Sequence, residues 1–117
     1  MSFSPREYLR HMLVEIDFLL DQTRTRTQDD VLSDPVLRRA IVRSIEIIGE
    51  AARQVPEDFR TCHPQIKWRL MAGMRNRLIH AYFGVDYEIV WNVATQQAPT
   101  LKQQIEQILA TDESEDP

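Results

Sequence analysis

The residues of this chain best suited to chemistry lie between positions 75 and 82, where an arginine, a histidine and a tyrosine occur close together. The guanidinium of Arg75 is planar and permanently charged, so it suits the charge that develops on a phosphate during cleavage. The imidazole of His80 can accept or donate a proton near neutral pH. These residue types favour phosphodiester chemistry.

The charge around this segment is basic, although the whole chain has a net charge of -4. A negative total argues against tight nonspecific binding of nucleic acid over the entire surface. Residues 60–85 nevertheless contain no acid. Their basic residues are Arg60, Lys67, Arg69, Arg75 and Arg77, with His63 and His80. Because such a run often only solvates a helix face, charge alone does not establish a binding site.

Helical geometry raises a difficulty for a catalytic pair within one chain. If residues 66–80 form a single helix, Arg69, Gly73, Asn76 and His80 share one face, and Asn76 can orient the His80 ring. Arg75 would then lie about 140° around the helix from His80. The pair therefore requires either a bent Arg75 side chain or a second copy of the chain that completes the site.

The first element that must support this segment is a helix over residues 5–22. Ser4, Pro5 and Glu7 form a typical start, with a capping box and a proline in the first turn. Its apolar face is wide, because Val14 and Phe18 extend the main stripe, and this width makes a dimer credible. The main stripe comprises Leu9, Met12, Leu13, Ile16, Leu19 and Leu20. Residues 21–30 read as a connection, with a short helical turn near residues 27–32.

A central helix is predicted from Pro35 to residue 55, capped by Ser33 or Asp34. Gly49 and the alanines beside it would let another helix approach closely. Its apolar stripe consists of Leu37, Ile41, Ile45, Ile48, Ala52 and Val55.

The second half of the chain continues the helical pattern. A single turn is expected within residues 56–64, followed by the helix over residues 66–80 with its buried stripe. Gly84 is expected to end that helix in a left-handed conformation, and Asp86 to cap the next. Pro99 breaks or restarts the pattern before a last helix. The buried stripe of the helix over residues 66–80 comprises Leu70, Met71, Met74 and Leu78. The apolar stripe of the last helix comprises Leu101, Ile105, Ile108 and Leu109.

These elements predict an all-α antiparallel bundle of four to five main helices, with no strand-like alternation. Residues 1–117 form one domain, and residues 111–117 are expected to be a disordered acidic tail. The lone Cys62, the lack of a basic-then-apolar leader and the short apolar runs predict a cytoplasmic protein outside the membrane. No metal or other cofactor is expected, because His11, His63 and His80 show no ligand spacing with Cys62 or with acids.

Three sequence blocks in order resemble the HepT-like branch of the HEPN superfamily. The first block is IGEAA at residues 48–52, and the second is MAGMRN at residues 71–76. The third is RNRLIHAY at residues 75–82, followed by FGVD and by the Val90-Trp91 pair. The likeness extends from about Ser4 to Leu109, and three ordered blocks are far more specific than an Arg-to-His spacing alone.

This resemblance implies a helical-bundle fold and a metal-independent endoribonuclease toxin that acts as a homodimer. Arg75 and His80 would form a composite catalytic site at the dimer interface, and Asn76 would position a phosphate or His80. The residues suit that chemistry, because RNA supplies its own 2'-hydroxyl nucleophile, His80 can move the proton and Arg75 can stabilise charge on phosphate oxygens.

The resemblance also implies a protein partner, an MntA-like minimal nucleotidyltransferase that acts as antitoxin in a type VII-like pair. The partner would transfer AMP from ATP to Tyr82 and could form a larger hetero-oligomer with the dimer. Nucleotides on Tyr82 would place bulk and negative charge beside Arg75 and His80. Without the resemblance, Tyr82 is as readily explained as a packing aromatic at a helix end.

Several alternatives remain open at this point. The chain could be a non-catalytic, nucleotide- or partner-binding subunit of a nucleotidyltransferase complex, in which Arg75 and His80 only hold a phosphate. Glu50 could pair with an arginine of the motif, although a solvated helix glutamate is more common. Trp68 and Trp91 are more readily explained as core or interface anchors than as platforms for RNA bases.

Overall fold

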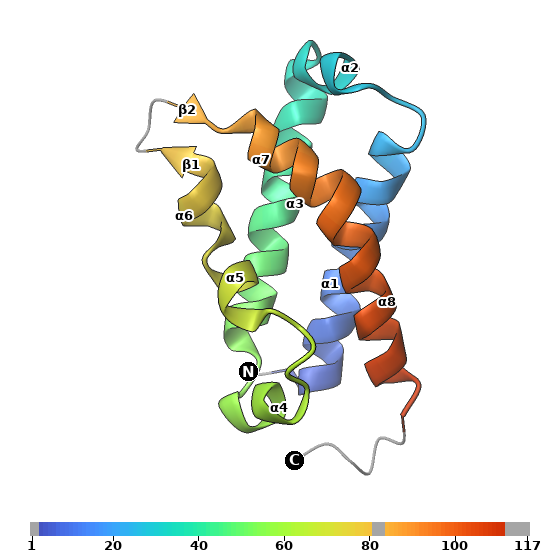
Figure 1. Cartoon of the computed structure of the whole chain (residues 1–117), viewed down its shortest axis with the longest axis vertical. Coiled ribbons are helices and arrows are strands. Elements are labelled where there is room, and N and C mark those ends of the chain that lie inside the picture. Colours follow the sequence, from blue (N-terminus) through green and yellow to red (C-terminus); the bar gives the residue numbers. More distant parts are fainter. Residues whose placement is uncertain (1–2, 81–83, 112–117) are drawn as a thin grey trace.

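The computed structural model describes residues 3–80 and 84–111, with His80 described through its backbone. Its long helices are α1 (Pro5–Thr23), α3 (Pro35–Gln54) and α8 (Ala98–Leu109). α1 packs along both α3 and α8, and α7 leads through a helical segment into α8 across the bundle (Figure 1). The predicted all-α fold is confirmed.

The start of α1 is stabilised by the predicted capping box. The Glu7 amide donates to the Ser4 hydroxyl at 3.2 Å, and the Ser4 amide donates to the Glu7 carboxylate at 3.2 Å. The Ser44 hydroxyl of α3 donates to the Glu15 carbonyl of α1 at 3.1 Å. The wide apolar face of α1 is used largely within its own bundle, and Val14 is its exposed member at 66%.

A short helix, α2 (Gln28–Leu32), links α1 to α3 as expected, with Thr27 as its cap. Of the two candidate caps for α3, the structure uses Asp34, whose carboxylate accepts the amides of Val36 and Leu37 at 3.0 and 3.1 Å. The cap matters because it satisfies donors that have no partner within the helix.

Gly49 brings α3 into close contact with α5 (Trp68–Ala72). A Cβ at position 49 would lie 2.8 Å from the backbone oxygen of Met71, closer than such atoms ever approach. The prediction that small residues permit close helix packing is therefore confirmed at Gly49. Arg53 strengthens the same junction by donating from Nη2 to the Ala72 carbonyl at 2.8 Å.

The turn between α3 and α5 is a short helix, α4 (Glu57–Cys62), as predicted. Phe59 is buried and contacts the His63 ring with centroids 4.5 Å apart. Trp68 is also buried, and its indole nitrogen donates to the His63 carbonyl at 3.0 Å. Trp68 is thus a core anchor, with its polar atom satisfied.

The prediction of one helix over residues 66–80 is wrong. The chain forms α5, then breaks at Gly73, and forms α6 (Met74–Leu78). It then becomes extended in β1 (Ile79–His80), which pairs antiparallel with β2 (Gly84–Val85). Ile79 pairs with Val85, and both pack against the core. Apolar spacing cannot reveal this ladder, because its pairing and shared burial are tertiary contacts.

The expected left-handed helix end at Gly84 is also wrong. Gly84 lies in β2, with φ outside the left-handed range and open space where a Cβ would be. Asp86 does cap α7 (Tyr87–Asn92) as predicted, accepting the Ile89 amide at 3.2 Å.

Pro99 restarts the last helix, and a π-helical segment, η1 (Val93–Gln97), precedes it. In a regular α-helix, Pro99 would offer no N–H to the Thr95 carbonyl and its ring would crowd that oxygen. The wider π turn, with the Ala98 amide bonded to the Val93 carbonyl, lets the chain continue as helix.

Arg6 ties the two ends of the chain together, a contact that the sequence pattern does not reveal. Its side chain is almost fully buried and donates to the Ile108 carbonyl at 3.1 Å and the Thr111 hydroxyl at 2.9 Å. Farther along the same two helices, Lys102 of α8 contacts Asp17 of α1 at 2.8 Å, and this hydrogen bond raises the pKa of Lys102. The predicted acidic tail lies outside the described residues, apart from Thr111. No helix in the described ranges is long and apolar enough to cross a membrane.

Gly49→Ala should lower the free energy of unfolding by about 1 kcal/mol. Overpacking against the Met71 carbonyl costs about 1–3 kcal/mol, which outweighs the roughly 1 kcal/mol gained in helix propensity. Urea denaturation followed by circular dichroism measures this difference. Gly84→Ala is the matched control, because its new Cβ would meet no atom of the described residues within 4 Å. Equal or greater stability of Gly49→Ala would contradict the close contact.

Candidate functional site

Arg75 lies on α6 and makes an ion pair with α3. Its Nε donates to Oε2 of Glu46 at 3.2 Å. The Arg75 side chain is 58% exposed, whereas that of Glu46 is 20% exposed. The anchored part of the pair is therefore the carboxylate, and the guanidinium extends toward solvent.

The hypothesis that Glu50 pairs with a motif arginine is not borne out. Glu50 instead pairs with Arg53 on its own helix at 3.0 Å, and both side chains are more than half exposed. Among the residues that the structure describes, Glu46, one turn earlier on α3, contacts Arg75 of the motif. No local pattern distinguishes these two glutamates, because the difference depends on where α6 lies against α3.

Asn76 and His80 do not lie one turn apart on a helix, which corrects the expected shared face. Asn76 is exposed on α6, whereas His80 belongs to β1, where its backbone pairs with Gly84. The Asp86 amide also donates to the Leu78 carbonyl at 2.7 Å, which closes the base of the ladder. Tyr82 lies outside the described residues.

The change from helix to strand increases the spacing between Arg75 and His80. Five helical residues rise about 7.5 Å, whereas three helical and two extended steps span roughly 11 Å. Along the chain, the path between the two residues is therefore longer than in a continuous helix. Arg75 and His80 also lie on different elements, α6 and β1, instead of on one helix.

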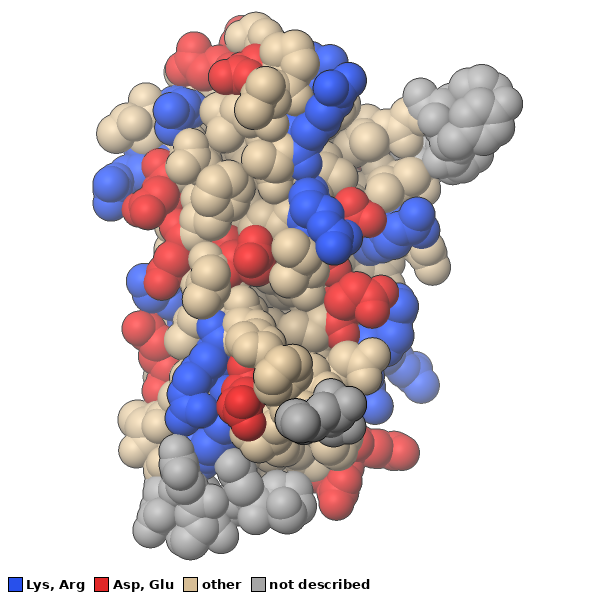
Figure 2. All heavy atoms as spheres, turned by 180° about the vertical axis from the view of Figure 1, so that it is seen from behind, with Lys and Arg blue, Asp and Glu red and all other residues tan. Residues whose placement is uncertain are grey.

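Arg75, a member of the basic stretch of the sequence, lies next to an acidic side chain of α3. Figure 2 shows basic and acidic side chains next to each other on the face that it displays. Glu46 and Glu50 of α3 are each paired with an arginine. Arg39 and Arg43 precede these glutamates along α3 and are exposed. α3 therefore carries both paired acids and exposed cations.

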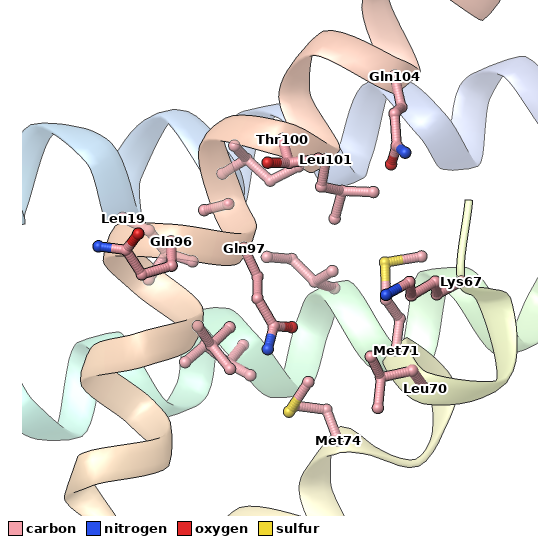
Figure 3. Close-up of a pocket in the computed structure, with 15 residues that line it drawn as sticks. Leu19, Lys67, Leu70, Met71, Met74, Gln96, Gln97, Thr100, Leu101 and Gln104 are labelled. Carbon is pink, nitrogen blue, oxygen red and sulfur yellow. The ribbon is translucent and has the colours of Figure 1, made fainter. Parts of the chain in front are cut away.

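A cavity of about 260 Å³ lies among α1, α3, α5, the start of α6, η1 and α8. Its walls are mainly apolar, with Lys67 and several amides at the edge; Met71 and Met74 face Gln97 and Leu101 across it (Figure 3). Of the residues predicted for chemistry, none that the structure describes lines this cavity. It does not bring the motif residues together.

Within the described ranges, no three His, Cys, Asp or Glu side chains are grouped so that they could hold a metal ion. Cys62 is exposed and unpaired with another cysteine.

Comparison with known proteins adds to this geometry. The sequence pattern of the family described as "Ribonuclease HepT-like" matches residues 12–108. The match contains the whole of α3, α5 and α6 and every residue predicted for chemistry. The chain belongs to the HepT-like ribonuclease family. The helical fold and the order of the motif blocks agree with this membership.

Several curated relatives span nearly the whole chain. A protein of Caldanaerobacter subterraneus, provisionally named an RNase, is 46% identical over 91% of this chain and 95% of its own length. A "Probable ribonuclease HepT" of Thermococcus cleftensis is 41% identical over 92% of this chain and 98% of its own. A provisionally named RNase of Methanocaldococcus jannaschii is 40% identical over 95% of this chain and 92% of its own length. No solved structure matches the chain significantly.

Proposed function

We propose that this HepT-like chain is a metal-independent endoribonuclease toxin of the cytoplasm, with Arg75 and His80 as its catalytic pair. The observation that carries the proposal is the placement of Arg75, exposed on α6 immediately before the strand that contains His80. The names of the relatives support RNA as the substrate class.

The residues account for the chemistry without an added cofactor. The 2'-oxygen of RNA attacks the adjacent phosphorus, and the bond from phosphorus to the 5'-oxygen breaks. His80 accepts the proton of the 2'-hydroxyl or donates one to the departing 5'-oxygen. Arg75 stabilises the charge on the nonbridging oxygens, and Asn76, exposed on the same helix, positions the phosphate or His80.

The active form in this proposal is a homodimer with a composite site. The placement of Arg75 on α6 and of His80 on β1 supports it, because the two residues do not share one helix face and a two-fold arrangement can bring the arginine of one copy near the histidine of the other.

The proposed regulator is a minimal nucleotidyltransferase antitoxin that binds the toxin, in a type VII-like pair, as a hetero-oligomer. The Tyr82 oxygen attacks the α-phosphorus of ATP, AMP is transferred and pyrophosphate leaves. The added phosphate competes with RNA for Arg75.

Purified protein with unmodified Tyr82 should cleave RNA in EDTA, and Arg75→Ala and His80→Ala should each reduce the rate at least about 100-fold, because each removes charge stabilisation or proton transfer. Gel analysis of labelled RNAs of diverse sequence measures the rate. Arg24→Ala and His11→Ala are the controls, since both residues are exposed at other parts of the bundle. Intact RNA with every protein would instead support a non-catalytic partner subunit.

Modification of Tyr82 can be tested directly. Incubation with the nucleotidyltransferase partner and ATP should raise the intact mass by whole AMP units and stop RNA cleavage, because the new phosphate occupies the cationic site. Tyr82→Phe should remain unmodified and active. Tyr87→Phe, a change on α7, should be modified like the parent. Mass spectrometry that finds AMP on Tyr82→Phe would refute the assignment.

Mixing inactive Arg75→Ala with inactive His80→Ala should restore up to about one quarter of parental activity, because some mixed dimers retain one complete site. Each variant alone, measured at the same total concentration, is the control. Sedimentation should show a dimer. A 13.7 kDa species at all concentrations, with no recovery on mixing, would contradict a shared site.

A further inference from the structure

In the ion pair between Arg75 and Glu46, the guanidinium nitrogen that makes the contact is Nε, which lies 3.2 Å from Oε2 of Glu46. A guanidinium has five N–H donors, and its terminal nitrogens form the fork that binds two phosphate oxygens. Holding Arg75 through Nε therefore orients the side chain and leaves its terminal fork available.

We propose that Glu46 is a positioning residue of the active site, which holds Arg75 through Nε so that the terminal nitrogens meet the scissile phosphate. This inference rests on the proposed function of Arg75. Nothing in the family match or in the names of the relatives assigns a role to Glu46.

The two helices joined by this contact differ in how firmly they are held. Glu46 lies on α3, a helix of 20 residues with a side-chain cap and a buried apolar stripe. Arg75 lies on α6, which has 5 residues, follows the break at Gly73 and has no side-chain cap. A long side chain on such a short helix needs an external support to keep one orientation, and α3 supplies it.

The pair of Glu50 with Arg53 provides an internal comparison. That pair joins two residues three apart on one helix, with side chains 57% and 52% exposed. The pair of Glu46 with Arg75 joins two helices, and Glu46 is only 20% exposed. Exposed ion pairs add little to stability. We therefore expect the Glu46 contact to orient the Arg75 side chain more than to stabilise the fold.

The test compares Glu46→Ala, Glu46→Gln and the matched control Glu50→Ala in RNA cleavage. Glu46→Ala should lower kcat about tenfold, less than the loss in Arg75→Ala, because the guanidinium remains but is no longer held in one orientation. KM should stay level or fall, because a negative charge near the RNA backbone is removed. Glu46→Gln should recover most of kcat, since its side-chain oxygen still accepts from Nε. Glu50→Ala should match the parent.

A second readout does not depend on activity. The Nε–H resonance of Arg75, identified by its loss in Arg75→Lys, should exchange with water faster in Glu46→Ala than in the parent or in Glu50→Ala. In cleavage, Glu46→Ala should have no added effect when Arg75→Ala is already present, because the two residues act as one unit. Melting temperatures verify that all variants are folded.

The outcomes separate this inference from the proposed function. If Arg75→Ala is inactive while Glu46→Ala keeps parental kcat, the positioning role of Glu46 is wrong and the catalytic role of Arg75 stands. An equal loss of activity in Glu46→Ala and Glu50→Ala would also overturn it. If Arg75→Ala cleaves RNA as well as the parent, the proposed function itself fails.

Discussion

The close packing of α5 and α6 against α3 is the constraint on which the arrangement of the motif depends. Gly49 permits this contact because a Cβ there would lie 2.8 Å from the Met71 oxygen. Arg53 bonds the end of α5, and Glu46 pairs with Arg75 of α6. Successive turns of one long helix thus hold two helices of five residues each, which are too short to be stable alone.

The same packing gives Arg75 and His80 different supports. Arg75 extends from α6 and is restrained by a carboxylate of α3, whereas the His80 backbone belongs to a strand that pairs with Gly84. Burial of Ile79 and Val85 against the core stabilises that strand. In the proposed mechanism, the cation and the proton carrier are therefore positioned by separate parts of the bundle, which fits a site assembled from two copies.

The tertiary structure also alters the local charge around the motif from what the basic sequence predicts. Residues 60–85 contain no acid, but α3 brings Glu46 to Arg75 in space. A carboxylate beside a phosphate-binding arginine weakens its attraction for phosphate and at the same time restricts its orientation. Arg39 and Arg43 are exposed on α3 and add positive charge from outside the basic segment of residues 60–85.

The sequence by itself determined the helical fold, the caps at Ser4 and Asp86 and the close approach at Gly49, because these depend on local hydrogen bonds, periodicity and side-chain size. It also identified the motif that places the chain among HepT-like ribonucleases. Only the tertiary structure decided that the helix ends at Leu78, that β1 pairs with β2 and that Glu46 rather than Glu50 reaches Arg75. Those features depend on contacts between residues distant along the chain, which apolar spacing does not encode.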